Sequence, residues 1–188
     1  MHSKIKEIRM RLGLSEAQIS SLLNISSYKY RRYENGTLTL SVEILVLLSI
    51  MYDISVDLLV FDKNNVNVIF KEESILKLLS VSKKERTAIL ESNMCKYCTF
   101  NCSSINYRVV KNIIVRFLNN FSKNLYELRC MNLFEVSEVS SLLNIEVDRY
   151  IYLENGKAWP TVYELIEIVS AFSKSINEIL EIKNETDF

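Results

Sequence analysis

The chain of 188 residues is poor in the residues that break regular structure, since it contains three glycines and one proline. All-β folds need frequent tight turns, which Gly and Pro favour, so this scarcity argues against an all-β fold. There is one histidine, and no glycine-rich phosphate loop is present. Catalysis by a cysteine would lack a local base. The sequence therefore predicts a protein that is not an enzyme.

Long apolar runs are also missing. No run approaches the roughly 20 residues that a membrane helix needs. The stretch Ile44–Met51 is too short to span a bilayer and is typical of a buried helix. The N-terminus does not have the charged and then apolar layout of a signal peptide. We therefore expect a cytoplasmic protein without membrane contacts.

Two segments of the chain recur at a fixed offset. Ser21–Ile25 (SLLNI) returns as Ser141–Ile145, and Glu34–Gly36 (ENG) returns as Glu154–Gly156. Self-similarity at a fixed offset indicates one supersecondary unit that occurs twice. We accordingly predict three parts: residues 1–61, a middle segment at 62–122 that does not repeat, and residues 123–188.

Each copy has the capping signals of five short helices. In the first copy, Ser15–Gln18 has the form of a capping box, in which the first hydroxyl and the Gln side chain bond each other's backbone amides. Asn24 is expected in a left-handed turn after the second helix. The remaining helix starts are predicted at Ser26, Ser41 and Ser55 in the first copy, and at Thr161 and Ser175 in the second.

This plan of helices resembles the phage-repressor and Cro type of helix-turn-helix domain, the XRE family. The similarity rests on core and turn residues in a fixed order: Leu14-Ser15, Ile19, Leu22–Ser26, Tyr33–Gly36, Leu45, Leu48 and Val56. It covers nearly all of residues 3–60 and most of residues 123–182. The resemblance implies an all-α fold with two five-helix repressor/Cro-like domains, joined by a helical linker segment.

One pair of opposite charges recurs with the repeat. Arg9 and Glu34 lie 25 residues apart, and Arg129 and Glu154 reproduce the pair. In the resembled family such a pair ties the first helix to the end of the third, and an Arg fork binds a carboxylate bidentately. The alternative is that these are unrelated surface charges.

The resemblance implies that the third helix enters the major groove of double-stranded DNA. Ser27, Tyr28 and Arg32 would face bases, while Lys29 and Arg31 would support them or contact phosphate. Asn35 and Thr37, just past the helix, are further candidates for phosphate contact. Two positions depart from the family pattern: Glu16 stands where a Gln is common, and Leu40 replaces a common Pro. The implied function is a sequence-specific transcriptional regulator, a repressor.

The second copy has a different outward surface. Residues 123–188 contain six basic and twelve acidic side chains, which disfavours phosphate contact. The third helix of this copy has Glu146 at its cap, followed by the exposed candidates Val147, Asp148, Arg149, Ile151 and Tyr152. Val147, Ile151, Tyr152 and Trp159 are expected to form an apolar patch that contacts a protein partner or a second copy in a homodimer. The alternative is that the middle segment covers them.

The middle segment contains a group of thiols. Cys95, Cys98 and Cys102 have the spacing C-x2-C-x3-C, which suits zinc or an iron–sulfur cluster. Closed sites usually need a fourth ligand, and the only other candidates are the remote residues Cys130 and His2. Reduced thiols without any cofactor are the simpler interpretation. Helices are expected at about 74–80, 83–91 and 105–121 of this segment.

Two hypotheses other than a DNA-binding repressor stay open. Glu16 and the net charge of zero favour a protein-interaction module that is derived from helix-turn-helix domains and no longer binds DNA. The cysteine motif favours a regulator that senses thiol oxidation or a metal ion.

Overall fold

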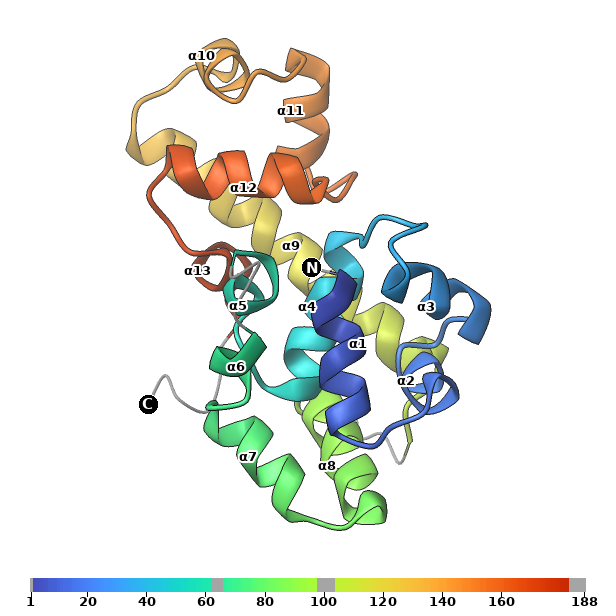
Figure 1. Cartoon of the computed structure of the whole chain (residues 1–188). Helices are drawn as coiled ribbons and strands as arrows, with labels where there is room; N and C mark the ends of the chain where they lie inside the picture. The colour runs from blue at the N-terminus through green and yellow to red at the C-terminus, as the bar shows by residue number, and fades with distance from the viewer. Residues whose placement is uncertain (1, 62–65, 98–103, 183–188) are drawn as a thin grey trace.

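The computed structural model describes residues 2–61, 66–97 and 104–182, and within these ranges it consists of helices and connecting turns without a strand (Figure 1). The first copy of the repeat forms five helices, and four of them begin directly after the predicted caps at Ser15, Ser26, Ser41 and Ser55. The five helices are α1 (His2–Arg11), α2 (Glu16–Leu22), α3 (Ser27–Glu34), α4 (Val42–Tyr52) and α5 (Val56–Val60). The all-α prediction is confirmed.

Local hydrogen bonds explain where these helices start and stop. The Ser15 hydroxyl accepts from the Gln18 amide, and the Gln18 side chain accepts from the Ser15 amide, which confirms the capping box. Asn24 has a φ of 53°, the predicted left-handed conformation. The Ser26 hydroxyl then accepts from the Lys29 amide and starts α3. Ser41 precedes α4 but makes no side-chain cap bond.

The second copy repeats the helix bounds. Three of its helices, α10 (Val136–Leu142), α11 (Val147–Glu154) and α13 (Ile176–Leu180), start and end 120 residues after α2, α3 and α5. The fourth, α12 (Val162–Ala171), ends one residue earlier than α4 does after the same offset. The predicted capping boxes at Thr161 and Ser175 are both present.

The middle segment contributes α6 (Val66–Ile69), α7 (Glu73–Ser80), α8 (Lys83–Lys96) and the start of α9 (Tyr107–Met131). Both α8 and α9 are longer than predicted. α9 crosses the predicted boundary at residue 122 without a break and supplies the first helix of the second copy. Residues 62–65, at the start of the middle segment, lie outside the described ranges.

The core of the first copy continues into the middle segment. Ten of the eleven residues of α4 are buried, and α8, α9 and α5 pack around this helix. Asn93 of α8 donates to the carbonyl of Met51 at 3.1 Å. The Arg86 guanidinium donates to the carbonyls of Leu12, Leu78 and Val81, and so fastens α8 to the end of α1. The middle segment therefore covers α4, which the first copy alone would leave partly open.

The two copies meet at their fifth helices, since α5 and α13 lie side by side in Figure 1 and contact each other. α9 also packs against α13, and Asn124 donates to the Ile179 carbonyl at 2.9 Å. In the described ranges, no helix combines the length and the apolar character that crossing a bilayer requires.

Candidate nucleic-acid interface

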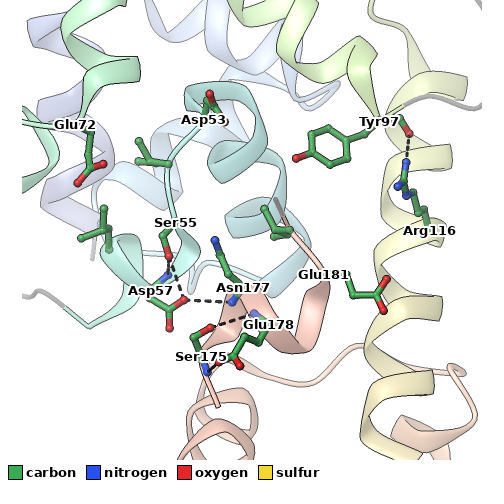
Figure 2. A pocket seen from close by; sticks show the side chains of 13 residues that line it. Asp53, Ser55, Asp57, Glu72, Tyr97, Arg116, Ser175, Asn177, Glu178 and Glu181 are labelled. Carbon is green, nitrogen blue, oxygen red and sulfur yellow. Dashed lines mark hydrogen bonds between the residues drawn. The ribbon is translucent and has the colours of Figure 1, made fainter. Parts of the chain in front are cut away.

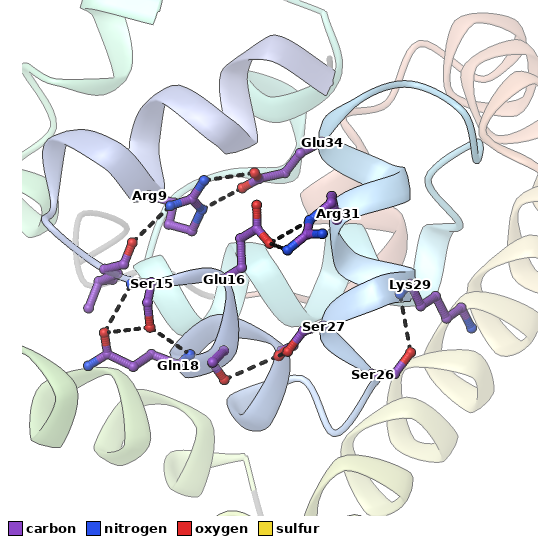
Figure 3. A network of polar contacts seen from close by, with 12 residues as sticks. Arg9, Ser15, Glu16, Gln18, Ser26, Ser27, Lys29, Arg31 and Glu34 are labelled. Carbon is purple, nitrogen blue, oxygen red and sulfur yellow. Dashed lines mark hydrogen bonds and ion pairs between the residues drawn. The ribbon is translucent and has the colours of Figure 1, made fainter.

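The turn between α2 and α3 holds these helices in contact through buried and polar side chains. The hydroxyls of Ser20 and Ser27 lie 2.9 Å apart, one on each helix. Ser20 is buried and Ser27 is half-buried. Ser27, predicted to face bases, thus begins α3 with its hydroxyl bonded across the turn (Figure 3). Its position favours a supporting role over base contact.

An ion pair anchors the C-terminal end of α3. Arg9 Nε and Nη2 donate to the two carboxylate oxygens of Glu34 at 2.6 and 2.8 Å, and Arg9 Nη1 donates to the Leu14 carbonyl at 2.9 Å (Figure 3). The Glu34 side chain is 1% exposed, and its hydrogen bonds to Arg9 raise the pKa of that guanidinium. The predicted bridge between the first and third helices is confirmed.

The second copy contains the same bridge. Arg129 Nη2 donates to Glu154 at 2.8 Å and Arg129 Nη1 donates to the Phe134 carbonyl at 3.2 Å. Because the two bridges occupy equivalent positions, they belong to the scaffold and do not distinguish one copy from the other.

The outward surface of α3 carries an aromatic ring and two basic side chains. Tyr28 is 70% exposed, Lys29 is exposed, and Arg32 is half-buried with its guanidinium 5.9 Å from the centre of the Tyr28 ring. Tyr28 and Arg32 share one face because they are four residues apart. Tyr30 and Tyr33 point inward and are buried. Hydroxyl, ammonium and guanidinium donors are thus presented together on one exposed surface.

Arg31 is engaged within the protein. Its Nε and Nη2 lie 2.9 and 2.8 Å from Glu16 Oε2, which joins α3 to the start of α2 (Figure 3). The hydrogen bond to Glu16 raises the pKa of the Arg31 guanidinium. Glu16, whose charge favours a module that no longer binds DNA, is therefore paired with Arg31, a residue that is predicted to contact DNA.

The residues past α3 form a tight exposed loop. Asn35 and Thr37 are both exposed. Arg32 Nη2 donates to the Thr37 carbonyl at 3.3 Å, and the Thr37 hydroxyl donates back to the Arg32 carbonyl at 3.3 Å. The loop thereby limits where the Arg32 guanidinium can reach.

The surface of α11 is apolar and acidic. Val147, Ile151 and Tyr152 are exposed, together with Asp148. Trp159, predicted to belong to the same patch, instead packs against the core. Val136 and Ile151 stand where the first copy has the ion pair of Glu16 and Arg31.

The one basic side chain of α11, Arg149, is bonded within the protein. Arg149 Nε and Nη2 each lie 2.8 Å from the Glu164 carboxylate, and Nη2 also donates to the Trp159 carbonyl at 2.9 Å. These bonds to Arg149 lower the pKa of Glu164, although its burial opposes the shift. α11 therefore lacks a cation that is directed at solvent.

The predicted metal ligands fall mostly outside the described ranges. Cys95 is half-buried on α8, whereas Cys98 and Cys102 are not described. Cys130 is exposed on α9. Among the described residues there is no group of His, Cys, Asp and Glu side chains that could hold a metal ion. Metal binding by the three cysteines stays a prediction.

A hollow of about 1070 Å³ lies beside the junction of α5 and α13 (Figure 2). Its polar lining includes the carboxylates of Asp53, Asp57, Glu72, Glu178 and Glu181 and the guanidinium of Arg116. An excess of carboxylates repels phosphate. This hollow is therefore poorly suited to nucleic acid.

Comparison with known proteins agrees with this geometry for the first copy. A family model described as Helix-turn-helix matches residues 5–59, which supports a DNA-binding regulator of the XRE type. The match includes α2, the turn at Asn24 and α3. No curated protein and no solved structure matches the chain.

Proposed function

We propose that the protein is a sequence-specific transcriptional repressor that inserts α3 into the major groove of its operator and acts by occupying a promoter. The observation that carries this proposal is the exposed surface of α3, where Tyr28, Lys29 and Arg32 stand on a helix whose end is fixed by Arg9 and Glu34. Arg pairs bidentately with guanine edges, and Lys neutralises phosphate.

The contrast between α3 and α11 supports the choice of α3. Both helices occupy the same place in their copies and both have the Arg–Glu bridge. Only α3 presents basic side chains to solvent, whereas Arg149, the one basic residue of α11, is bonded to Glu164. DNA binding requires positive charge near the phosphates, so we assign the reading function to the first copy.

The test is the affinity of a Lys29→Ala/Arg32→Ala variant for a duplex that the natural protein selects from a random pool. Loss of the Arg32 contact to a base edge, worth about 1–3 kcal/mol, together with the Lys29 contact to phosphate should weaken binding at least tenfold. Lys83→Ala/Lys84→Ala removes the same charge from the exposed start of α8 and should change affinity less than twofold. Equal losses in the two variants would contradict a specific role for α3.

We propose further that the α11 surface contacts a protein partner rather than DNA. Exposed Val147, Ile151 and Tyr152, next to Asp148, suit an apolar contact better than a phosphate backbone. An Ile151→Glu variant should keep the operator affinity of the purified protein while regulation of a reporter in cells is lost. Unchanged regulation would refute the partner, and weakened DNA binding would show that α11 contacts the operator.

A further inference from the structure

Two helices from the two copies cap each other at their junction. The amide of Val56, the first residue of α5, donates to Asn177 Oδ1 at 3.0 Å. The amide of Ile176, the first residue of α13, donates to Asp57 Oδ1 at 3.0 Å. Asp57 Oδ2 also accepts from the Asn177 amide at 3.2 Å (Figure 2). Each helix start is therefore satisfied by a side chain of the other helix.

These contacts are reciprocal in the terms of the repeat. Asp57 and Asn177 are equivalent positions, and so are Val56 and Ile176. In an isologous interface between two identical subunits, residue i contacts j and residue j contacts i. The junction of α5 and α13 has this pattern within a single chain, so these two helices pair as equivalent helices do across the axis of a two-fold dimer.

The surface used for this pairing is buried. Val56 and Leu59 of α5 are 0% exposed, and Ile176 and Ile179 of α13 are at most 1% exposed. α9 closes the junction from another side, because Asn120 and Asn124 donate to the carbonyls of Leu180 and Ile179. A second molecule therefore cannot contact these apolar faces of α5 and α13 while this arrangement persists.

We infer that the chain is an internal pseudo-dimer in which only one of the two copies reads DNA. One molecule therefore binds a single half-site, and this site has no two-fold symmetry. This inference rests on the proposed function of α3. A symmetric regulator reads two half-sites in inverted orientation, because its two-fold axis repeats the reading helix. In this chain, α11 takes the place that the second reading helix has in a symmetric dimer.

The α11 helix does not read bases. Val147, Asp148 and Ile151 offer no hydrogen-bond donor from their side chains, and Arg149 is bound to Glu164. The hydroxyl of the exposed Tyr152 is the one remaining side-chain donor on this surface, at the position where α3 has the guanidinium of Arg32. Specificity therefore comes from one groove contact, made by α3. The second copy packs against the first and stabilises it, but its α11 does not provide a second surface that reads DNA.

The experiment begins with oligonucleotides selected from a random pool by the full chain. The best duplex is then compared with an inverted repeat of its consensus, with centres one helical turn (about 34 Å) apart. Affinity is measured by fluorescence anisotropy, and stoichiometry by analytical ultracentrifugation. We expect a consensus without a dyad, one molecule per half-site, and an inverted repeat that binds no more than about twofold more tightly.

Two results would overturn the inference and leave the proposed function standing. One is cooperative binding of two molecules to the inverted repeat. The other is a gain above tenfold for one molecule on that repeat, which would mean that α11 reads DNA as well. Selection of no duplex over unrelated sequences would instead overturn the proposed function, and the inference with it.

Discussion

Asp57 and Asn177, which stand at equivalent positions of the two copies, each accept a hydrogen bond from the first amide of the other's helix. The exchange satisfies donors that a helix start leaves open. The exchange also joins the two copies, each of which is so small that its core alone would be only marginally stable. The contact between α5 and α13 therefore contributes to the stability of both parts of the chain.

The first prediction concerns this exchange. Asp57→Ala removes both bonds to α13 and should lower the free energy of unfolding by about 1–2 kcal/mol, the usual cost of losing a helix cap. Asp57→Asn keeps one acceptor and should cost about half as much. Urea unfolding monitored by circular dichroism measures both. Identical stabilities of the Ala variant and the natural protein would show that the caps contribute nothing.

A second prediction concerns the bridge behind α3. Arg9→Ala leaves the Glu34 carboxylate, 1% exposed, without its counter-charge and should destabilise the protein by about 3–5 kcal/mol. Arg11→Ala breaks the exposed pair of Arg11 with Glu7 and should cost less than about 1 kcal/mol. Thermal and urea unfolding compare the two variants. Similar costs would contradict the anchoring role of Arg9.

The third prediction follows from the pairing of Glu16 with Arg31. Glu16→Gln removes an acid near the reading surface and releases a guanidinium toward phosphate. Operator binding should become several-fold tighter, and the slope of log K against log salt should steepen by about 0.9 if one phosphate contact is gained. Glu7→Gln makes the same charge change in the exposed pair on α1 and is the control. Weaker binding by Glu16→Gln would mean that the ion pair positions α3 instead of restraining Arg31.

The fourth prediction concerns acid stability of the second copy. The pKa of Glu164 lies below its ordinary value of 4.5 in the folded protein, chiefly because Arg149 donates to it. The carboxylate therefore stabilises the fold above pH 4.5, and this contribution is lost as the pH falls through the lower folded pKa. Glu164→Gln should be less stable than the natural protein near neutral pH, and this difference should shrink as the pH falls below 4.5.

Fluorescence of Trp159, the single tryptophan, is a suitable readout because its carbonyl accepts from Arg149. Arg149→Ala removes the cause of the pKa shift and should flatten the acid dependence in the same way. A stability difference that stays constant with pH would contradict the coupling of Glu164 to Arg149.

The sequence predicts what is decided locally. The boxes at Ser15, Ser82, Thr161 and Ser175 depend on residues three apart, and each one starts a helix in the structure. The Arg9–Glu34 bridge was predictable because the repeat reproduces it. α8 extends to Lys96, past its expected end at residue 91, so the first cysteine of the motif lies in its last turn.

The contacts that the sequence did not reveal depend on how helices cross or dock. Glu16 meets Arg31 because the turn at Asn24 sets α2 against α3, and the sequence spacing of 15 residues does not reveal this contact. Asp57 and Asn177 are 120 residues apart and meet through docking of the two copies. The matching offset was a signal for that contact, because equivalent polar residues at two helix starts are suited to a reciprocal interface.

The central claim is that α3 contacts operator DNA and α11 does not. The most direct measurement places a photo-crosslinking amino acid at position 28, or at the equivalent position 148, where Tyr28 and Asp148 are both exposed. Illumination with the selected duplex should crosslink DNA to the protein labelled at position 28 and leave the protein labelled at position 148 free. Crosslinking at position 148, or none at position 28 while the duplex remains bound, would contradict the account.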